Sequence, residues 1–339
     1  CGHMTLPVMC IGAGYFSRFH TEAWHRIEGV DLVGVYDRDT LRADTAGVPA
    51  APTLEALLET GRGGIVDVIT PPPSHLDLIK TALAYDPAAI ICQKPFCESL
   101  DQAKRATELA AEASVPLIVH ENFRFQPWYR TLKSAIESGH VGDLQQLTFR
   151  FRPGDGQGPD AYLSRQPYFQ KMDRFLIHET AVHWIDTFRY LMGEPKGVFA
   201  DLRRMNPSIA GEDAGYILFF YEDGKRALFD GNRLLDHSAE NTRCTMGEAL
   251  IEGSEGTLTL LGNGQVLLRK FGKTTSRSLL GPTLGQGFGG DCVYHLQSHV
   301  VRALEGIGNF ENTAEDYLSV IEQENLIYSS AEKQATVWL

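Results

Sequence analysis

A histidine–glutamate–histidine cluster at residues 178–183, H-E-T-A-V-H, has residue types that either bind a metal or move a proton. Zinc proteases carry H-E-x-x-H on a helix, with both histidines on one face. Here the spacing is one residue longer, so at about 100° per residue of α-helix His178 and His183 would lie roughly 140° apart. Glu179 and His183, four residues apart, would be neighbours. The spacing therefore favours a carboxylate–imidazole pair for proton transfer and no metal site, with a structural buried polar pair as the alternative.

A second candidate site begins where the apolar run Leu6–Ile11 leads into G-A-G-Y-F-S at residues 12–17. Two glycines at this spacing, between a strand and a helix, permit a tight turn and close approach of backbone N–H groups to a pyrophosphate. Asp37 follows Gly14 by 23 residues, where dinucleotide-binding folds place the acid that binds the ribose hydroxyls. A carboxylate there repels a 2′-phosphate, so NAD is expected over NADP, although Arg38 could soften this preference. A plain tight turn is the alternative interpretation.

Further segments occur in a fixed order along the chain. They are T-P-P-P-S-H at residues 70–75, Q-K-P at 93–95, N-F-R-F-Q-P at 122–127, the stretch at 178–183, and F-E-N-T-A-E-D-Y at 310–317. Together with the glycine motif they closely resemble the glucose–fructose oxidoreductase/inositol dehydrogenase (Gfo/Idh/MocA) family of NAD(P)-dependent oxidoreductases. The resemblance covers nearly the whole chain and implies a Rossmann domain followed by an α+β domain.

The family pattern is E-K-P followed by D-x-x-x-H on a helix of the second domain. By this resemblance Lys94 is the catalytic lysine, which reaches the nicotinamide ribose and the substrate hydroxyl, and His183 accepts the hydroxyl proton. Both types suit the chemistry, because oxidation of an alcohol needs a proton acceptor and gains from a positive charge near the developing alkoxide. Glu179 stands where the family has Asp, and Gln93 replaces the Glu of E-K-P. The resemblance also implies a cis peptide bond between Lys94 and Pro95.

The full set of expected contacts follows from the motifs and the resemblance. The expected cofactor-binding residues are Gly12, Gly14, Tyr15, Phe16, Asp37, Arg38, Thr70, Pro71, Pro72, His75, Gln93, Lys94 and Asn122. The expected substrate-binding residues are Lys94, Asn122, Arg152, Gln166, His178, Glu179 and His183, with Tyr162 and Arg165 as weaker candidates. Alternatives stay open for two of these residues, and two nearby residues have roles of their own. His75 could only cap a helix, His178 could only pack, Arg124 could form an ion pair between the domains, and Asp186 could orient His183.

The first part of the chain alternates between apolar runs and helical spacing, which is typical of a parallel sheet covered by helices on both faces. Expected strands are Leu6–Ile11, Val30–Tyr36, Gly64–Thr70, Ala89–Gln93 and Leu117–His120; expected helices are Tyr15–Ile27, Leu54–Leu58, His75–Ala84 and Leu100–Ala113.

After residue 143 the apolar residues alternate with polar ones, which indicates antiparallel strands with one packed face. Expected strands are Leu144–Arg152, Val198–Arg204, Tyr216–Tyr221, Ala227–Asp230, Thr257–Leu261 and Val266–Lys270; expected helices are Glu179–Met192, Val293–Leu304 and Ala314–Ala331. The predicted architecture is a Rossmann domain at residues 4–121 and an α+β domain with a large open, mainly antiparallel sheet at 122–339. The C-terminal helix is expected to be able to pack back on the first domain.

The net charge of −12 argues against nucleic-acid and anionic membrane surfaces, and no apolar run approaches the length of a membrane span. The start C-G-H-M reads as a tag remnant before a native Met4, with no secretion signal. Scattered cysteines without a C-x-x-C pair predict reduced thiols in a cytoplasmic protein. The resemblance implies a homodimer or homotetramer formed through the second sheet.

These observations predict an NAD-dependent dehydrogenase that acts on a hydroxyl group of a sugar or polyol, either an aldose or a cyclic polyol. Two alternatives stay open. One is a redox-neutral, glycosidase-like enzyme that holds NAD tightly, and the other is a dinucleotide-binding regulator without turnover. A regulator would be expected to lack the lysine or the histidine, and both Lys94 and His183 are present.

Overall fold

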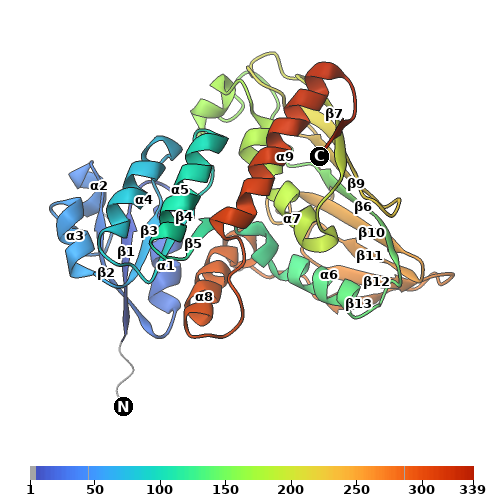
Figure 1. Ribbon diagram of the computed structural model, residues 1–339. Helices are drawn as coiled ribbons and strands as arrows, with labels where there is room; N and C mark the ends of the chain where they lie inside the picture. The colour runs from blue at the N-terminus through green and yellow to red at the C-terminus, as the bar shows by residue number, and fades with distance from the viewer. Residues whose placement is uncertain (1–4, 45, 286) are drawn as a thin grey trace. The chain divides into compact units, whose positions relative to one another are not determined.

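The computed structural model describes residues 5–44, 46–285 and 287–339, so the expected tag remnant and the start at Met4 lie outside the described residues. The chain divides into two compact units (Figure 1). Unit 1 contains the residues through Asn122 and also Val293–Ser319, and unit 2 contains Phe123–Cys292 and Val320–Leu339. The first division falls one residue after the predicted boundary, whereas Val293–Ser319 belongs to unit 1 and not to the continuous second domain of the prediction.

Unit 1 is built on a five-stranded parallel sheet with the strand order β2-β1-β3-β4-β5. Its strands are mostly apolar, as expected for a parallel sheet with helices on both faces. The strands are β1 (Leu6–Ile11), β2 (Val30–Tyr36), β3 (Ile65–Val68), β4 (Ala89–Gln93) and β5 (Leu117–His120). The helices between them are α1 (Ser17–Arg26), α2 (Thr40–Asp44), α3 (Leu54–Thr60), α4 (His75–Leu83) and α5 (Leu100–Glu112), with the 3-10 turn η1 (Pro72–Ser74) before α4.

The strand order reverses at β1. The second strand, β2, lies on one side of β1, and the chain then crosses over so that β3, β4 and β5 follow on the other side. Open α/β sheets bind their ligands outside the carboxyl ends of the strands at such a switch point. The glycine turn at residues 12–14 follows β1 at this position, so the topology places the predicted cofactor motif where the fold class binds ligands.

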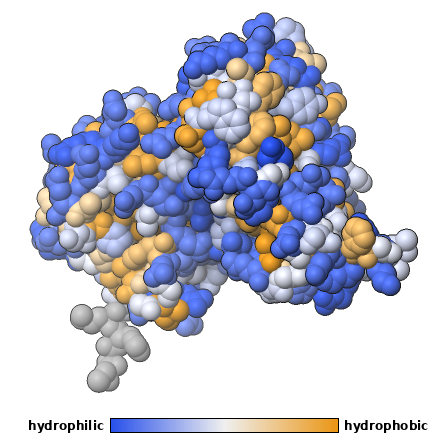
Figure 2. Space-filling model, turned by 45° about the vertical axis from the view of Figure 1, so that its right-hand side comes forward, coloured by the Kyte–Doolittle hydropathy of each residue, from blue (hydrophilic) through white to orange (hydrophobic). Residues whose placement is uncertain are grey.

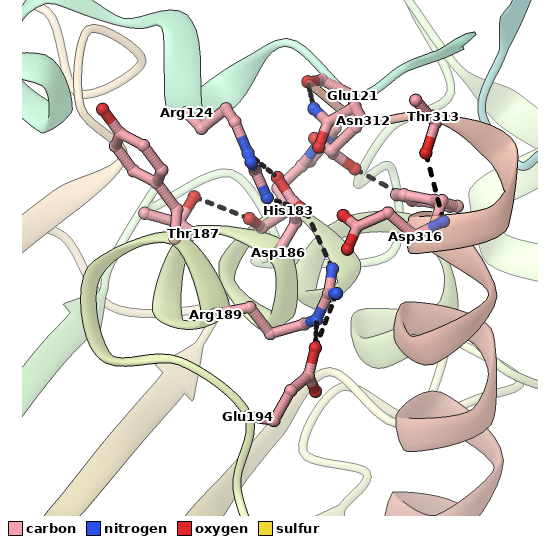
Figure 3. Close-up of polar contacts among 12 residues, drawn as sticks. Glu121, Arg124, His183, Asp186, Thr187, Arg189, Glu194, Asn312, Thr313 and Asp316 are labelled. Carbon is pink, nitrogen blue, oxygen red and sulfur yellow. Dashed lines mark hydrogen bonds and ion pairs between the residues drawn. The ribbon is translucent and has the colours of Figure 1, made fainter. Parts of the chain in front are cut away.

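A late segment of the chain completes unit 1 beside β5. Asn312 accepts the backbone N–H of Val119 with its carbonyl oxygen at 2.8 Å, and its side chain donates to the carbonyl oxygen of Glu121 at 2.6 Å (Figure 3). The hydroxyl of Tyr317 donates to the Glu121 carboxylate at 3.0 Å, and that carboxylate is fully buried. Residues from the C-terminal part of the chain, including most of helix α8 (Cys292–Leu304), therefore belong to the first unit.

Unit 2 is built on a nine-stranded sheet with the order β13-β12-β11-β10-β6-β9-β8-β7-β14. The β6–β9 pair is parallel, and the other seven pairs are antiparallel. The strands are β6 (Leu144–Phe151), β7 (Gly197–Arg203), β8 (Ala214–Phe220), β9 (Arg226–Asn232), β10 (Gly247–Gly253), β11 (Gly256–Leu260), β12 (Val266–Lys270), β13 (Arg277–Leu280) and β14 (Val337–Trp338). The remaining elements are η2 (Phe123–Phe125), α6 (Pro127–Glu137), η3 (Pro167–Lys171), η4 (Leu176–Ala181), α7 (Val182–Met192), η5 (Phe288–Gly290) and α9 (Ala314–Lys333), which begins in unit 1.

The core of unit 2 forms where α7 covers one face of this sheet. Trp184 of α7 lies against Phe149 of β6 and Phe229 of β9, with ring centroids 4.6 and 5.6 Å apart. All three side chains are almost fully buried. The strands alternate between buried and partly exposed residues, as expected for a sheet with one packed face. This packing fixes α7, which carries the predicted proton acceptor.

The structure corrects the expected helix around His178 and His183. Residues Leu176–Ala181 form a π-helix, and the α-helix begins only at Val182. The estimate of roughly 140° between the two histidines assumed a regular α-helix, so it does not apply to this segment. Sequence analysis also assigned no element to α2, α6, β10, β13 or β14. The sequence at residues 281–290, G-P-T-L-G-Q-G-F-G-G, is rich in glycine, and residue 286 within it lies outside the described residues.

Among the described helices, none combines the length and apolar character of a membrane span. Figure 2 shows hydrophilic residues over most of the face in view, with hydrophobic residues in smaller separate groups.

Candidate functional site

The turn after β1 requires glycine at its first position and leaves space at its second. Gly12 has φ +110°, and a Cβ there would lie 3.0 Å from the carbonyl carbon of Ile69. At Gly14, outside its chain neighbours, no described heavy atom lies within 4 Å of the position that a Cβ would take. Helix α1 begins three residues later without an acidic residue in its first turn. The turn therefore presents backbone and a helix N-terminus to open space, which fits an anionic group such as a pyrophosphate.

Asp37, immediately after β2, is bound to the same turn. One carboxylate oxygen accepts the backbone N–H of Ala13 at 2.7 Å, and the other accepts the N–H of Asp39 at 2.8 Å. These two bonds orient the carboxylate, and each oxygen retains further acceptor capacity for a ligand hydroxyl. The arrangement suits a ribose diol. Arg38, the next residue, is exposed.

Aromatic side chains surround the turn. Tyr15 is 56% exposed and Phe16 is 41% exposed, which is high for side chains of this size. The Arg18 guanidinium lies 4.1 Å from the Tyr15 ring centroid and donates to its hydroxyl at 2.6 Å. The turn is therefore followed directly by two solvent-exposed aromatic rings.

The segment after β3 holds Thr70, Pro71 and Pro72 at the same edge of the sheet. The hydroxyl of Ser74 donates to the carbonyl oxygen of Pro71 at 2.9 Å, so the 2.6 Å contact between the Thr70 and Ser74 hydroxyls must use the proton of Thr70. The Thr70 oxygen is therefore left as an acceptor for a ligand hydroxyl. Thr70 and Pro72 are half-buried, and Pro71 is exposed.

The His75 ring does not occupy the cofactor position that we expected. It is fully buried, with Nε2 2.6 Å from the carbonyl oxygen of Thr70 and Nδ1 2.7 Å from that of Phe96. Burial lowers the pKa of His75, although the carbonyl oxygens of Phe96, Thr70 and Pro95 favour the protonated ring. The ring instead joins the end of β3 to the segment that follows Lys94, which is the structural alternative.

Lys94 follows the last residue of β4, and its peptide bond to Pro95 is cis, as predicted. Lys94 is half-buried, and its backbone N–H donates to the side-chain oxygen of Gln93 at 3.0 Å. Asn122, two residues after β5, is buried. The predicted residues of unit 1 therefore gather at the carboxyl ends of the parallel strands.

In unit 2, His183 lies in the first turn of α7 and stacks on a phenylalanine. The rings of His183 and Phe123 are parallel within 3°, with centroids 3.8 Å apart. His183 is 9% exposed. Phe123 belongs to the short turn η2, so this turn sets the plane of the imidazole.

The same turn is held by a buried ion-pair network (Figure 3). Both oxygens of Asp186 accept hydrogen bonds from Arg124, at 2.8 and 2.7 Å, and one is 3.5 Å from Arg189. Arg189 in turn pairs with Glu194 at 2.6 Å. The expectation that Asp186 orients His183 stays a prediction. The Arg124 ion pair lies within unit 2, in contrast to the expected ion pair between the domains. Because Arg124 belongs to η2, its bonds to Asp186 hold this turn to α7.

The π-helix is anchored by a buried cation that sequence analysis did not identify. Arg233, 4% exposed, hydrogen-bonds the hydroxyl of Thr180 and lies 3.4 Å from Asp155. Its guanidinium carbon lies 4.5 Å from the ring centroid of Phe175. Tyr162 also donates to Asp155, at 2.9 Å, so the loop before the π-helix is joined to the same cation. Arg233 directly follows β9, and the alternating sequence pattern of that strand gives no indication that the next residue is a buried cation.

Glu179 lies within the π-helix and is half-buried. Burial and, second, the Glu179 carboxylate raise the pKa of Tyr168 to about 12, which indicates that the carboxylate and the phenol are close. Tyr168 is 51% exposed and was also missed from the sequence. The expected neighbourhood of Glu179 and His183 stays a prediction.

Four other expected substrate residues have contacts within unit 2. Arg152 is buried and pairs with Asp230 of the neighbouring strand β9 at 2.7 Å, so its guanidinium joins two strands, in contrast to the predicted substrate contact. His178 bonds to Glu324 of α9 through Nδ1, and its side chain is 35% exposed. Gln166 is half-buried and lies 3.5 Å from the Tyr168 hydroxyl. Arg165 lies 3.7 Å from Asp155.

Within the described ranges, no group of three or more His, Cys, Asp or Glu side chains has an arrangement that could hold a metal ion.

Two family models match the chain in order. The model described as an oxidoreductase family with an NAD-binding Rossmann fold matches residues 6–121, and the GFO/IDH/MocA C-terminal domain matches residues 129–259. A D-apiose dehydrogenase of Paraburkholderia graminis is 30% identical over 97% of this chain and 88% of its own. A D-apiose dehydrogenase of Rhizobium rhizogenes is 33% identical over 74% of this chain and 72% of its own.

Among solved structures, an oxidoreductase from Agrobacterium radiobacter in complex with NAD+, L-tartaric acid and magnesium has a TM-score of 0.87. It is 29% identical, and the match covers 98% of both chains. These findings confirm the predicted two-domain architecture, the oxidoreductase class and the NAD-binding Rossmann fold. By its two matched domains and its near full-length similarity to one D-apiose dehydrogenase, this chain belongs to the Gfo/Idh/MocA family of NAD-binding oxidoreductases.

Proposed function

We propose that this protein is an NAD-dependent dehydrogenase that oxidises a hydroxyl-bearing carbon of a sugar or polyol, with D-apiose and related pentoses as the first candidate substrates. The observation that carries the proposal is the glycine turn, with open space at Gly14 and the Asp37 carboxylate bound to the same turn. The two D-apiose dehydrogenases among its relatives support the choice of a pentose.

The reaction removes a proton from the hydroxyl oxygen and a hydrogen with two electrons from carbon, so that C–OH becomes C=O. Bound NAD supplies the acceptor for that hydrogen and its electrons. The protein must then hold the hydroxyl, receive its proton and exclude water. In the proposal Lys94 contacts the hydroxyl with its ammonium group and stabilises the developing negative oxygen. His183 accepts the proton, with its ring plane held by Phe123.

The remaining predicted contacts divide between cofactor and substrate. The Asp37 carboxylate accepts hydrogen bonds from the ribose hydroxyls and repels a 2′-phosphate, so NAD is the preferred cofactor. Tyr15, Phe16 and Thr70 contribute ring faces and a hydroxyl acceptor on the cofactor side. Glu179 binds substrate hydroxyls, and the exposed Tyr168 beside it adds a further contact.

The test measures the absorbance of NADH formed from NAD, and of NADPH formed from NADP in parallel, with D-apiose, other pentoses, hexoses and inositols as substrates. The expected result is turnover with NAD and one sugar class. Losing either acid–base group typically costs 10²–10⁴-fold, so Lys94→Ala and His183→Ala are each expected to lower kcat/KM within that range. Tight NAD binding without turnover on any sugar would refute the dehydrogenase and favour the redox-neutral enzyme or the regulator.

We also propose a homo-oligomer, formed through the face of the nine-stranded sheet opposite α7. The strand registers align Leu218, Leu228, Leu250 and Leu267 in one row on that face, with Thr148 and Thr259 between them. These leucines are half-buried or exposed, and a two-fold axis would bury them against the same row of a second copy. Light scattering on the wild type and on Leu250→Glu tests this, since a monomeric wild type would refute it.

A cytoplasmic location is proposed on the buried thiols Cys10, Cys92 and Cys97.

A further inference from the structure

A chain of polar side chains leads from the interior of unit 1 to Lys94. Asp67, in the middle of the apolar strand β3, is fully buried, and one of its oxygens lies 2.8 Å from Nδ1 of His20. The same oxygen accepts the indole N–H of Trp24 at 2.8 Å. Nε2 of His20 lies 3.3 Å from the side-chain nitrogen of Gln93. The side-chain oxygen of Gln93 accepts the backbone N–H of Lys94 at 3.0 Å.

The donors and acceptors in this chain have one consistent order. Since the backbone N–H of Lys94 can only donate, the Gln93 amide must face it with oxygen and face His20 with nitrogen. The amide nitrogen can only donate, so Nε2 of His20 must be an acceptor without a proton. The ring proton then sits on Nδ1 and is donated to the Asp67 carboxylate. Each group therefore specifies the orientation of the next one.

We infer that Asp67, His20 and Gln93 form a positioning relay that fixes the backbone at Lys94, and that glutamine at position 93 keeps the His20 ring neutral in its Nδ1–H form. This inference rests on the role proposed for Lys94. None of the three residues touches the reacting atoms in the proposal, so they are positioning residues and not catalytic ones.

The relay explains the consequence of glutamine at a position where the family pattern has glutamate. A carboxylate at residue 93 can only accept, so it would face the unprotonated Nε2 with a second lone pair. The ring could satisfy both Asp67 and a glutamate at 93 only by holding two protons and a positive charge. With glutamine, the ring meets one carboxylate and one amide donor, and no extra buried charge is required.

The groups around the ring are uncharged apart from the Asp67 carboxylate. The ring of His120 lies 4.3 Å from that of His20, and burial lowers the pKa of His120 to about 3, so it is uncharged at neutral pH. Burial and the nearby Asp67 raise the pKa of the Cys10 thiol, and burial also raises that of Cys92. The Asp67 carboxylate, whose pKa is lowered, is the charged member facing the ring from β3.

The first test reads the tautomer directly by nitrogen NMR of isotope-labelled histidine rings, with the His20 signals assigned by their loss in His20→Asn. The expected wild-type result is a protonated Nδ1 and an unprotonated Nε2. In Gln93→Glu both nitrogens should carry protons at neutral pH. An Nε2–H tautomer in the wild type, or a singly protonated ring in Gln93→Glu, would overturn the relay.

The second test separates positioning from folding. His20→Asn places an amide nitrogen near the former Nδ1, so it retains the Asp67 contact and loses the one to Gln93. Gln93→Met, at a half-buried position, removes both amide contacts and serves where His20→Asn does not fold. Small displacements of reacting groups cost up to about 10²-fold in rate, so kcat should fall about tenfold or more in both variants, measured on protein that is still folded.

An unchanged kcat in a folded variant would show that the relay does not position Lys94. Failure of the proposed function looks different, because a wild type that turns over no sugar leaves the NMR result intact. In that case the tautomer and its response to Gln93→Glu still decide whether the relay exists.

Discussion

Replacing Asp186 with leucine should strongly destabilise unit 2, because it removes the carboxylate between two buried arginines. Arg124 is 7% exposed and makes its two short bonds, 2.8 and 2.7 Å, to this carboxylate. Arg189 is held less closely by Asp186, at 3.5 Å, and retains Glu194 at 2.6 Å. Breaking a buried pair by removing one partner costs about 3–5 kcal/mol. We expect about 3 kcal/mol, since one of the two arginines remains paired.

The structure also predicts how this loss can be reversed. Arg124→Met alone should cost about 3 kcal/mol, because it removes the two short hydrogen bonds to the buried Asp186 carboxylate. The double variant Arg124→Met/Asp186→Leu removes both charges, and replacing a whole buried pair with apolar residues is near neutral. The double variant should therefore be more stable than either single variant, with a coupling energy of several kcal/mol between the two sites.

Urea unfolding measures these effects through tryptophan fluorescence, since Trp128 and Trp184 are buried in unit 2. Glu137→Gln is the matched control, because Glu137 is 63% exposed in its pair with Lys133 and should contribute at most about 1 kcal/mol. Costs that simply add in the double variant would refute the reasoning. A loss below about 1 kcal/mol in Asp186→Leu would do so as well.

Three further predictions concern unit 1. Gly12→Ala should destabilise this unit by about 1 kcal/mol or more and weaken NAD binding in calorimetry, because φ is +110° and the new Cβ would lie 3.0 Å from the Ile69 carbonyl carbon. Asp37→Asn should raise the kcat/KM ratio of NADP over NAD roughly fivefold, since it removes a repulsion of about 1 kcal/mol. His120 is held neutral with its pKa lowered to about 3, so the unfolded state takes up a proton first as the pH falls below about 6.5. The free energy of unfolding should fall by about 1.4 kcal/mol per pH unit from this residue, and less steeply in His120→Phe.

Specific results would contradict each of these three. Unchanged stability and NAD affinity in Gly12→Ala would show that the turn tolerates a side chain. A constant cofactor ratio in Asp37→Asn would remove Asp37 from cofactor selection. Parallel pH profiles for the wild type and His120→Phe between about pH 4 and 6.5 would show that His120 is not held neutral.

The parallel strands could be predicted closely from the sequence because their burial on both faces leaves an uninterrupted apolar run. Leu6–Ile11, Ala89–Gln93 and Leu117–His120 match the observed strands residue for residue. Strand β10 was missed because its apolar residues Ala249–Ile251 are consecutive, so no polar–apolar alternation marks it, and Leu250 is exposed on the outer face. The π-helix was missed because its hydrogen bonds follow a different period from the one that sequence spacing assumes.

The site residues that could be predicted belong to local sequence motifs, whereas the contacts that were missed join residues far apart in the sequence. The glycine turn and Asp37 belong to a local motif, and the structure places them together. Arg152 was misassigned because its partner Asp230 is set by the pairing of β6 with β9, which the local sequence does not encode. A signal for the relay was present, since Asp67 interrupts the apolar run G-I-V-D-V-I-T, but its partner His20 lies 47 residues away.

The division of the chain has a consequence for its synthesis. The ribosome completes β1–β5 of unit 1 long before it makes Val293–Ser319, which supplies Asn312 to the backbone of β5 and Tyr317 to the buried Glu121 carboxylate. Until then these polar groups must be satisfied by water or by other partners. The unit that begins first is therefore completed only after all strands of the nine-stranded sheet except β14 have been synthesised. A fragment that ends at Asn122 would carry the nucleotide motif but would lack the segment that closes its last strand.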